Sequence, residues 1–129
     1  MSAAIHFTRT YDEAFALLLE ARSYAIDAGG RRHGGDPAVR LAHSCESLRL
    51  TARLAQIVAW LLAQKAHQAG ELSAEDLRRR EYRLGGQRVC LDWRAADERP
   101  LPPPLRSLMR RSYDLYCRVH RLDSQYAPG

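Results

Sequence analysis

The longest periodic pattern of apolar residues in this chain lies between Cys45 and Ala66. On a helical wheel, bulky aliphatic side chains share one arc and small side chains dominate the adjoining arc. The first arc contains Leu50, Leu54, Ile57, Val58, Leu61 and Leu62, and the second contains Leu41, Leu48, Ala52, Ala55, Ala59, Ala63 and Ala66. Two apolar arcs need two neighbours, so the pattern predicts the central helix of a small bundle, with its alanine arc closest to another helix.

The bounds of this central helix are marked by strong local signals. Asp36 is a good N-cap, Pro37 suits the first helical position, and Gly70 suits a C-terminal stop. A helix over residues 37–69 would be about 50 Å long, which is longer than a 129-residue globule is wide. We therefore expect a second subunit to cover part of it, and predict a homodimer.

Two more helices are predicted, over residues 10–28 and 104–126, on either side of the central one. Thr10 to Glu13 reads as a capping box, and Gly29-Gly30 ends the first helix. The last helix has a clear apolar stripe with the usual three- and four-residue spacing. The predicted fold is an all-α three-helix bundle in a single domain, 1–129, with a connector over residues 70–103.

The connector carries weaker signals. Leu77, Arg80, Glu81 and Leu84 give a weak helical stripe, which Gly85-Gly86 interrupts. The segment QRVCLDW alternates as a short strand would, but the chain offers no second strand to pair with it. We therefore expect a loop whose Leu91 and Trp93 dock on the bundle, followed by a stiff proline-rich approach to the last helix.

Composition favours a cytoplasmic globular protein that needs no cofactor. Apolar residues make up 46% of the chain, but no run approaches the ~20 residues of a membrane span, and the N-terminus lacks a signal-peptide pattern. Cys45, Cys90 and Cys117 are scattered, which disfavours a disulfide framework or a zinc site. The five histidines form no ligand pair, so we expect no metal.

No catalytic constellation emerges from the sequence, and we expect no enzyme. The loop GGRRHGG could cradle a phosphate, but it lacks the lysine and the strand of a P-loop, so a hinge between helices is favoured. Ser44, Ser47 and Thr51 fall within the central helix, where hydroxyls bond back to the backbone. An enzyme such as a small phosphohydrolase would require acids or histidines clustered in a pocket.

The charge of the chain leaves one alternative open. The net charge is +5, with nineteen arginines and a single lysine, and it is spread thinly along the sequence. A nucleic-acid-binding regulator could use the 31–40 loop and the arginines of the last helix, although such footprints are usually concentrated. If those arginines pair with acids, the footprint is lost. They are Arg106, Arg110, Arg111, Arg118 and Arg121.

The third strip of the central helix is the most informative one. It holds Glu46, Arg49, Arg53, Gln56 and Trp60, continued by Gln64 and His67. Spacings of three and four residues place these side chains in one row, which we call the polar row. It has two interpretations: an internal salt-bridge ladder with Trp60 half covered by the 85–100 loop, or a partner-binding face. Arginine and tryptophan are enriched at interface anchors, which favours partner binding.

At this row the chain resembles a known bacterial family, the RcdA-like proteins, typified by the regulator of CtrA degradation. The pattern ESxRLTxRLxQxxxWLL over residues 46–62 carries the resemblance, together with Gly70-Glu71, Arg118 and Arg121-Leu122-Asp123. The similarity covers about residues 8–125. Members of the family act as adaptors that help the ClpXP protease take selected substrates.

The resemblance implies a dimeric three-helix bundle that works without a cofactor and acts by tethering proteins. The expected function is thus an adaptor in regulated proteolysis linked to the cell cycle, with a protease and its cargo as partners. The segment 82–104 departs from the family pattern, and few residues follow Asp123.

Overall fold

The computed structural model describes residues 2–30, 36–90 and 101–126 of the chain. Helices and turns account for the regular structure of these residues, and no strand occurs among them. The long helices are α1 (Ser2–Gly30), α2 (Pro37–Gln68) and α5 (Pro103–Asp123). The short elements are the 3₁₀ turns η1 (Asp76–Arg78), η2 (Arg80–Tyr82) and η3 (Ser124–Tyr126), and the one-turn helix α3 (Gln87–Cys90).

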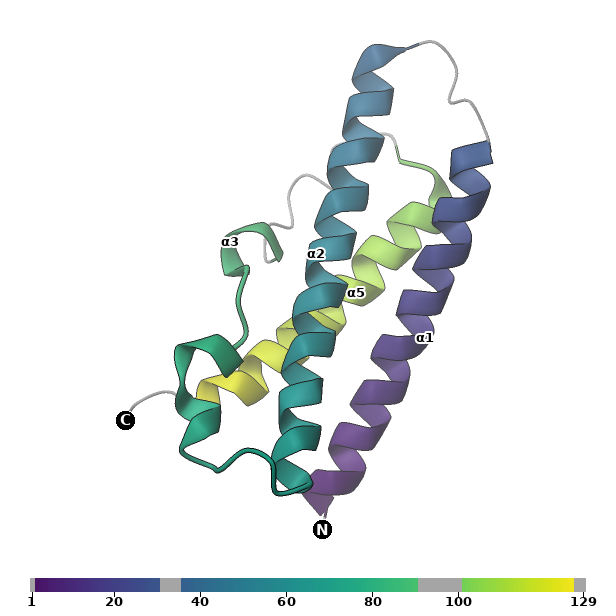
Figure 1. Ribbon diagram of the computed structural model, residues 1–129. Helices are drawn as coiled ribbons and strands as arrows, with labels where there is room; N and C mark the ends of the chain where they lie inside the picture. The colour runs from purple at the N-terminus through teal and green to yellow at the C-terminus, as the bar shows by residue number, and fades with distance from the viewer. Residues whose placement is uncertain (1, 31–35, 91–100, 127–129) are drawn as a thin grey trace.

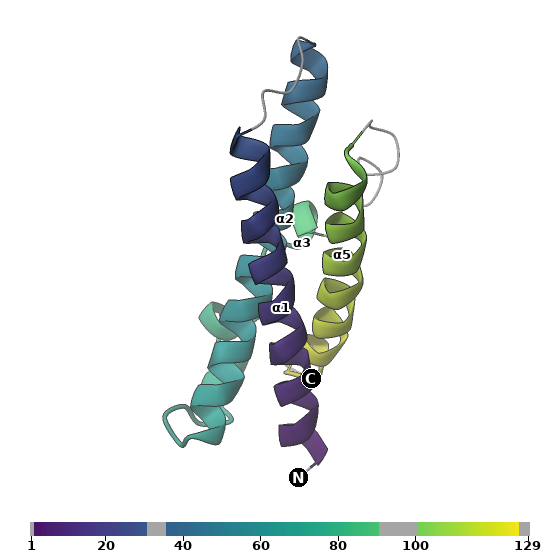
Figure 2. The same cartoon turned by 90° about the vertical axis from the view of Figure 1, so that its right-hand side faces the viewer.

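The three long helices pack against one another around a shared apolar core. α1 and α2 lie side by side in opposite directions, and α5 crosses behind them (Figure 1). In the view turned by 90°, α5 runs along one side of the α1–α2 pair (Figure 2). The all-α three-helix architecture predicted from the sequence is confirmed. The core includes Ala14 and Leu17 of α1, Leu50, Leu54, Ile57 and Leu61 of α2, and Leu105, Leu108, Met109, Leu115 and Val119 of α5.

α2 begins as its local signals predict. The Asp36 carboxylate accepts a hydrogen bond from the backbone N–H of Ala38 at 3.0 Å, and Pro37 occupies the first turn. The helix ends at Gln68, followed by Gly70 in a left-handed conformation (φ +80°) that suits glycine. Its 32 residues span about 48 Å at the α-helical rise. Its N-terminal end projects beyond the start of α5 (Figure 2).

α1 begins eight residues earlier than the capping box suggested. Thr10 lies inside the helix and is buried, rather than capping its N-terminus. The additional turns carry Phe7 to the ring of Trp60, which it meets edge to face with 5.7 Å between centroids. This packing across helices offsets the local preference for a start at Thr10.

The described part of the connector, residues 70–90, packs against α2 as short turns instead of one helix. Leu77, Leu84 and Cys90 are buried apolar anchors of this part, and Leu101 is buried just before α5. Gln87–Cys90 forms α3, which lies on the side of α2 away from α1 (Figure 1). The docking predicted for Leu91 and Trp93, and the hinge or phosphate loop predicted at 31–35, lie outside the described residues.

The prediction that the alanine arc of α2 makes the closest helix contact is wrong for this chain. Ala55 and Ala59 are exposed, and Leu41 and Leu48 are 65% and 71% exposed. The second buried side of α2 is the polar row, because α5 and the connector pack there. The wheel correctly indicated two buried sides but assigned the wrong residues to one of them.

Candidate functional site: the polar row of the central helix

The polar row lies inside the fold and not on its surface. Glu46 and Arg53 are fully buried, Trp60 and Gln64 are each 2% exposed, and Arg49 and Gln56 are half-buried. The outward-facing row that the sequence suggested is therefore corrected. Its side chains bind the connector and α5. Binding of a partner by Glu46, Arg49, Arg53, Gln56 and Trp60 stays a prediction, and it would require the connector to leave α2.

Arg53 ties three elements together from its place in the middle of α2. Its Nε donates to the carbonyl oxygen of Cys90 at 2.7 Å, and its Nη1 donates to the carbonyl oxygen of Met109 at 3.1 Å. The guanidinium also lies 5.1 Å from the ring centroid of Tyr113, a cation–π contact. Burial lowers the pKa of Arg53 below its ordinary value. Carbonyl oxygens and an aromatic face thus take the place of water around a buried charge.

One turn before Arg53, a charged pair adds to the buried part of the row. Arg49 Nη1 donates to Glu46 Oε1 at 2.5 Å, across a spacing of three residues on the same helix. The Glu46 side chain is fully buried, whereas that of Arg49 is 17% exposed. The pair therefore resembles the internal ladder that was the first interpretation of the row. The Arg49 side chain extends from the interior to the protein surface.

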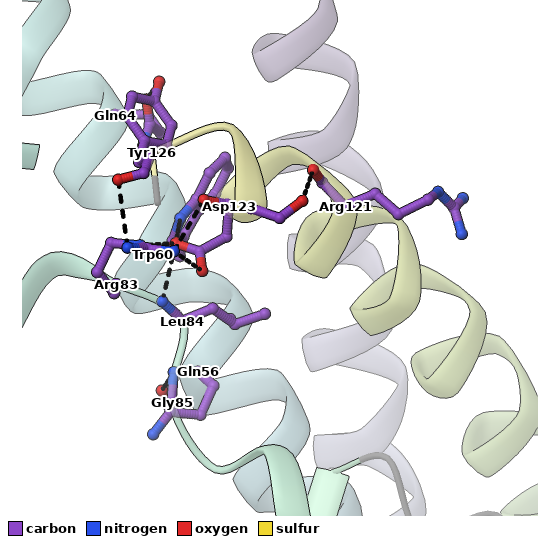
Figure 3. A network of polar contacts seen from close by, with 10 residues as sticks. Gln56, Trp60, Gln64, Arg83, Leu84, Gly85, Arg121, Asp123 and Tyr126 are labelled. Carbon is purple, nitrogen blue, oxygen red and sulfur yellow. Dashed lines mark hydrogen bonds and ion pairs between the residues drawn. The ribbon is translucent and has the colours of Figure 1, made fainter. Parts of the chain in front are cut away.

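The far end of the row is organised by Asp123, the last residue of α5 (Figure 3). Its Oδ1 accepts hydrogen bonds from Trp60 Nε1 at 3.0 Å, from Arg83 Nε at 2.9 Å and from the backbone N–H of Leu84 at 3.1 Å. Its Oδ2 accepts a further bond from Arg83 Nη2 at 3.2 Å. Asp123 is only 3% exposed. One carboxylate thus joins α2, the connector and α5, and we call this arrangement the Asp123 clamp.

A second set of bonds fixes the connector at Gly85. The side-chain oxygen of Gln56 accepts from the Gly85 N–H at 3.0 Å, and the Tyr116 hydroxyl donates to the Gly85 carbonyl at 2.6 Å. A Cβ at Gly85 would lie 3.1 Å from the Gln56 oxygen. Gly86 has φ +71°, the left-handed region that favours glycine. Glycine is therefore favoured at Gly86 by the backbone conformation and at Gly85 by the close approach of the Gln56 side chain.

Trp60 is enclosed by aromatic rings as well as held by its hydrogen bond. Phe7 of α1 and Tyr126 of η3 both meet it edge to face, Tyr126 with 6.4 Å between centroids. The Tyr126 hydroxyl in turn donates to Gln64 Oε1 at 3.0 Å. Its aromatic cover among the described residues therefore comes from both ends of the chain. The cover predicted from the 85–100 loop lies mostly outside the described residues.

Sequence reasoning missed the partners of the row. Arg83, Asp123 and Tyr126 were not singled out as site residues, because their partners are far away in the sequence. Asp123 and Tyr126 reach α2 across 63 and 62 residues of chain, and Arg83 reaches Asp123 across 40. One signal was present: the Arg121-Leu122-Asp123 motif had already marked Asp123 as part of the family pattern. Chemically, this network holds elements in place, since each polar atom described above is occupied by the protein itself.

The exposed arginines of α5 are partly neutralised by α1. Arg111 makes two hydrogen bonds with the Glu20 carboxylate, at 2.7 and 2.5 Å, and Arg118 pairs with Glu13. The hydrogen bonds from Arg111 lower the pKa of Glu20 below its ordinary value. Two of the five arginines proposed for a nucleic-acid footprint are thus paired with acids.

The described residues contain no group of three or more histidine, cysteine or acidic side chains that could hold a metal ion. None of their helices is long and apolar enough to cross a membrane. Cys90 is buried, and burial raises the pKa of its thiol. This shift makes the reactive thiolate form less accessible.

Comparison with known proteins agrees with the fold and the motifs. Residues 1–128 match a family described as "Protein of unknown function (DUF1465)". No curated protein matches the chain. Among solved structures, the crystal structure of RcdA from Caulobacter crescentus CB15 is similar, with a TM-score of 0.70 and 32% sequence identity. The match covers 94% of this chain and 90% of that chain.

Both matches extend over nearly the whole chain, so they include α1 and α5 as well as the α2 motif. The resemblance inferred from residues 46–62 and 118–123 is confirmed. The chain belongs to the DUF1465 family and is an RcdA-like protein.

Proposed function

We propose that this protein is a non-enzymatic adaptor in regulated proteolysis of the ClpXP type, linked to the cell cycle and acting in the cytoplasm. The observation that carries the proposal is the similarity to RcdA, at 32% identity over 94% of the chain. An adaptor works by binding two proteins at once and so raising their effective concentration for each other. Such a role needs a rigid frame and exposed docking surfaces.

The architecture supports this role. The buried polar groups of α2 are used to fix the connector and α5, which gives the small bundle a defined shape. Large apolar side chains are meanwhile exposed on α1 and α2. The alternative, a nucleic-acid-binding regulator, draws less support, because Arg111 and Arg118 are paired with α1 acids.

The adaptor proposal predicts that specific proteins live longer when the chain is absent. Protein half-lives would be measured by mass spectrometry after protein synthesis is stopped, in cells of the native organism with and without this chain. A protein stabilised in its absence would then be purified and mixed with ClpXP. Adding this chain should accelerate its degradation by about tenfold or more at substrate concentrations below saturation, because tethering makes the encounter intramolecular.

A ClpXP substrate whose half-life does not depend on the chain serves as the control, and its degradation rate should not change. Unaltered half-lives throughout the proteome would contradict the adaptor proposal. An equal rate of degradation with and without the chain would contradict it as well.

We also propose that the working form is a homodimer. α2 is about 48 Å long and its N-terminal end projects beyond the start of α5, so the other described helices cover only part of it. Sedimentation equilibrium at micromolar concentration should give about twice the chain mass of 14.6 kDa. A mass that stays at one chain over the whole concentration range would exclude the homodimer.

A further inference from the structure

The exposed large hydrophobic side chains of the described residues all lie on α1 and α2. Together they leave several hundred Å² of apolar surface open, the order of the ~800 Å² that each partner contributes to a stable interface. They are Phe15 (46% exposed), Leu18 (38%), Leu19 (47%), Ile26 (65%), Leu41 (65%), Leu48 (71%) and Leu62 (50%). One side of the α1–α2 pair is covered by α5, and these residues mark a side that the described residues leave open.

On α2 this uncovered surface has the spacing of a coiled coil. Exposed or partly exposed small and leucine side chains recur at alternating intervals of four and three residues through four heptads. We call this row the α2 seam. It consists of Leu41, Cys45, Leu48, Ala52, Ala55, Ala59, Leu62 and Ala66. A row of this kind fits another helix lying along it with a close interhelical distance, because five of its eight side chains are alanine or cysteine.

An apolar groove of about 540 Å³ runs beside the seam, between α1 and α2. Leu48 of the seam lines it, together with Ala25 of α1. Leu18 lies seven residues before Ala25, on the same row of α1, so the exposed side chains of α1 continue the groove. The seam, the groove and the α1 side chains thus form one surface.

The order of large and small residues along the seam indicates what covers it. If a second α2 runs antiparallel, centred between Ala52 and Ala55, every leucine of the seam meets a small residue. The opposed pairs are Leu41 with Ala66, Cys45 with Leu62, Leu48 with Ala59, and Ala52 with Ala55. This is also the pairing of a with d positions that an antiparallel coiled coil requires. In a parallel pair, each leucine would meet its own copy and each alanine would leave a gap.

Charges beside the seam permit the antiparallel arrangement. Arg49 of one copy would flank Gln56 of the other, and Lys65 would flank Ser44. No like charges face each other in these flanking pairs, so the approach of two copies carries no repulsion there. The seam is therefore complementary to itself in size, and the flanking charges do not oppose the pairing.

We propose that a second copy of this chain docks antiparallel along the α2 seam, with Cys45 of each copy opposite Leu62 of the other. This inference rests on the homodimer proposed above and adds its interface and its register. The two α1–α2 pairs would face each other as a four-helix layer, and the two α5 helices would lie on the outside. The outer surfaces of α5 and of the connector would then remain open to protein partners on both ends of the assembly.

The native Cys45 allows a direct test by disulfide formation with one new cysteine. Leu62→Cys would be made in a Cys117→Ser chain, which retains only the buried Cys90 as a further thiol. Under a mild oxidant such as diamide, the antiparallel register brings Cys45 and the new thiol within bonding distance, so a covalent dimer should form. Adding Cys45→Ser should abolish this dimer, because the two copies of residue 62 would be about 26 Å apart.

Ala16→Cys, in a chain lacking Cys45 and Cys117, is the matched control for random collision, since Ala16 is exposed on α1 and off the seam. It should give no covalent dimer. A disulfide that survives Cys45→Ser would indicate parallel pairing and overturn the proposed register. Noncovalent dimers that fail to crosslink would place the interface elsewhere and leave the homodimer standing. A monomer at all concentrations would overturn both.

Discussion

Replacing Arg53 with alanine is expected to destabilise the fold by about 3–5 kcal/mol, because it removes a charged donor to buried carbonyl groups and opens a cavity. The Arg53 guanidinium donates to the carbonyls of Cys90 and Met109, which lie in α3 and α5. Water cannot replace it, because Arg53 is fully buried. The loss would therefore combine the missing donor to the Cys90 carbonyl with the missing contact to Tyr113. The Met109 carbonyl would keep the hydrogen bond that it accepts from the Ser112 hydroxyl at 3.0 Å.

The measurement is the free energy of unfolding by chemical denaturation. Arg40→Ala on the same helix is the matched control, since Arg40 is exposed, and it should change stability by no more than ~0.5 kcal/mol. Arg53→Lys should restore only part of the loss, because an ammonium lacks the planar fork that reaches two carbonyls. Equal stabilities of Arg53→Ala and Arg40→Ala would contradict the structural role of Arg53.

This prediction also separates the two interpretations of the polar row. A recognition residue would lose partner affinity when replaced, while the fold would stay intact. Replacing the buried Arg53 should instead lower the stability of the fold and leave the affinity for the partner, per folded molecule, unaltered. An unaltered melting temperature combined with a loss of partner affinity would support the partner-binding interpretation of the row, which the sequence favoured.

The sequence was most informative where the structure depends on residues that are close together in the sequence. Asp36 and Pro37 mark the start of α2 through bonds that span two residues, so the helix could be placed without its surroundings. The same cap, together with the stop at Gly70, predicted the length of α2. The family motif gave the fold, and the structure and the comparisons agree with it.

Sequence reasoning failed where distant parts of the chain decide the outcome. A wheel shows which residues share an arc of α2, but not where α5 and the connector pack. Arg53 looked like a surface residue because the carbonyls that accept its hydrogen bonds lie 37 and 56 residues away. Thr10 looked like a cap because the packing of Phe7 against Trp60 is not visible locally.

Contacts between residues far apart in the sequence also explain why the structure of the connector was not predicted. Its stripe of Leu77, Arg80, Glu81 and Leu84 predicted a weak helix, but the backbone at Arg79 and Arg83 is extended and divides it into short turns. The extended backbone at Arg83 immediately precedes the Leu84 and Gly85 amides, which donate to Asp123 and Gln56. Side chains of the bundle thus provide acceptors that a helix of the connector would have provided internally.

Replacing Asp123 with alanine is the second substitution expected to have a large effect, about 3–5 kcal/mol, because three donors lose a buried charged acceptor at once. Trp60 Nε1, the Arg83 guanidinium and the Leu84 N–H all bond to this carboxylate. Arg83 would keep its bonds to the carbonyls of Asp123 and Tyr126. Trp60 Nε1 and the Leu84 N–H are more deeply buried, and neither donates to another acceptor in the hydrogen bonds described above.

Asp114→Ala is the matched control, since Asp114 is an exposed acid on the same helix and should change stability by no more than ~0.5 kcal/mol. Hydrogen exchange supplies a second readout that depends on position. In Asp123→Ala, the amides of Leu84 and Gly85 should exchange faster than the change in global stability explains, because the clamp that holds the connector is gone. Uniform acceleration over the whole chain would mean that Asp123 only stabilises the bundle. Selective acceleration over residues 80–90 would show that the clamp is what keeps the connector on α2, and hence what keeps the polar row covered.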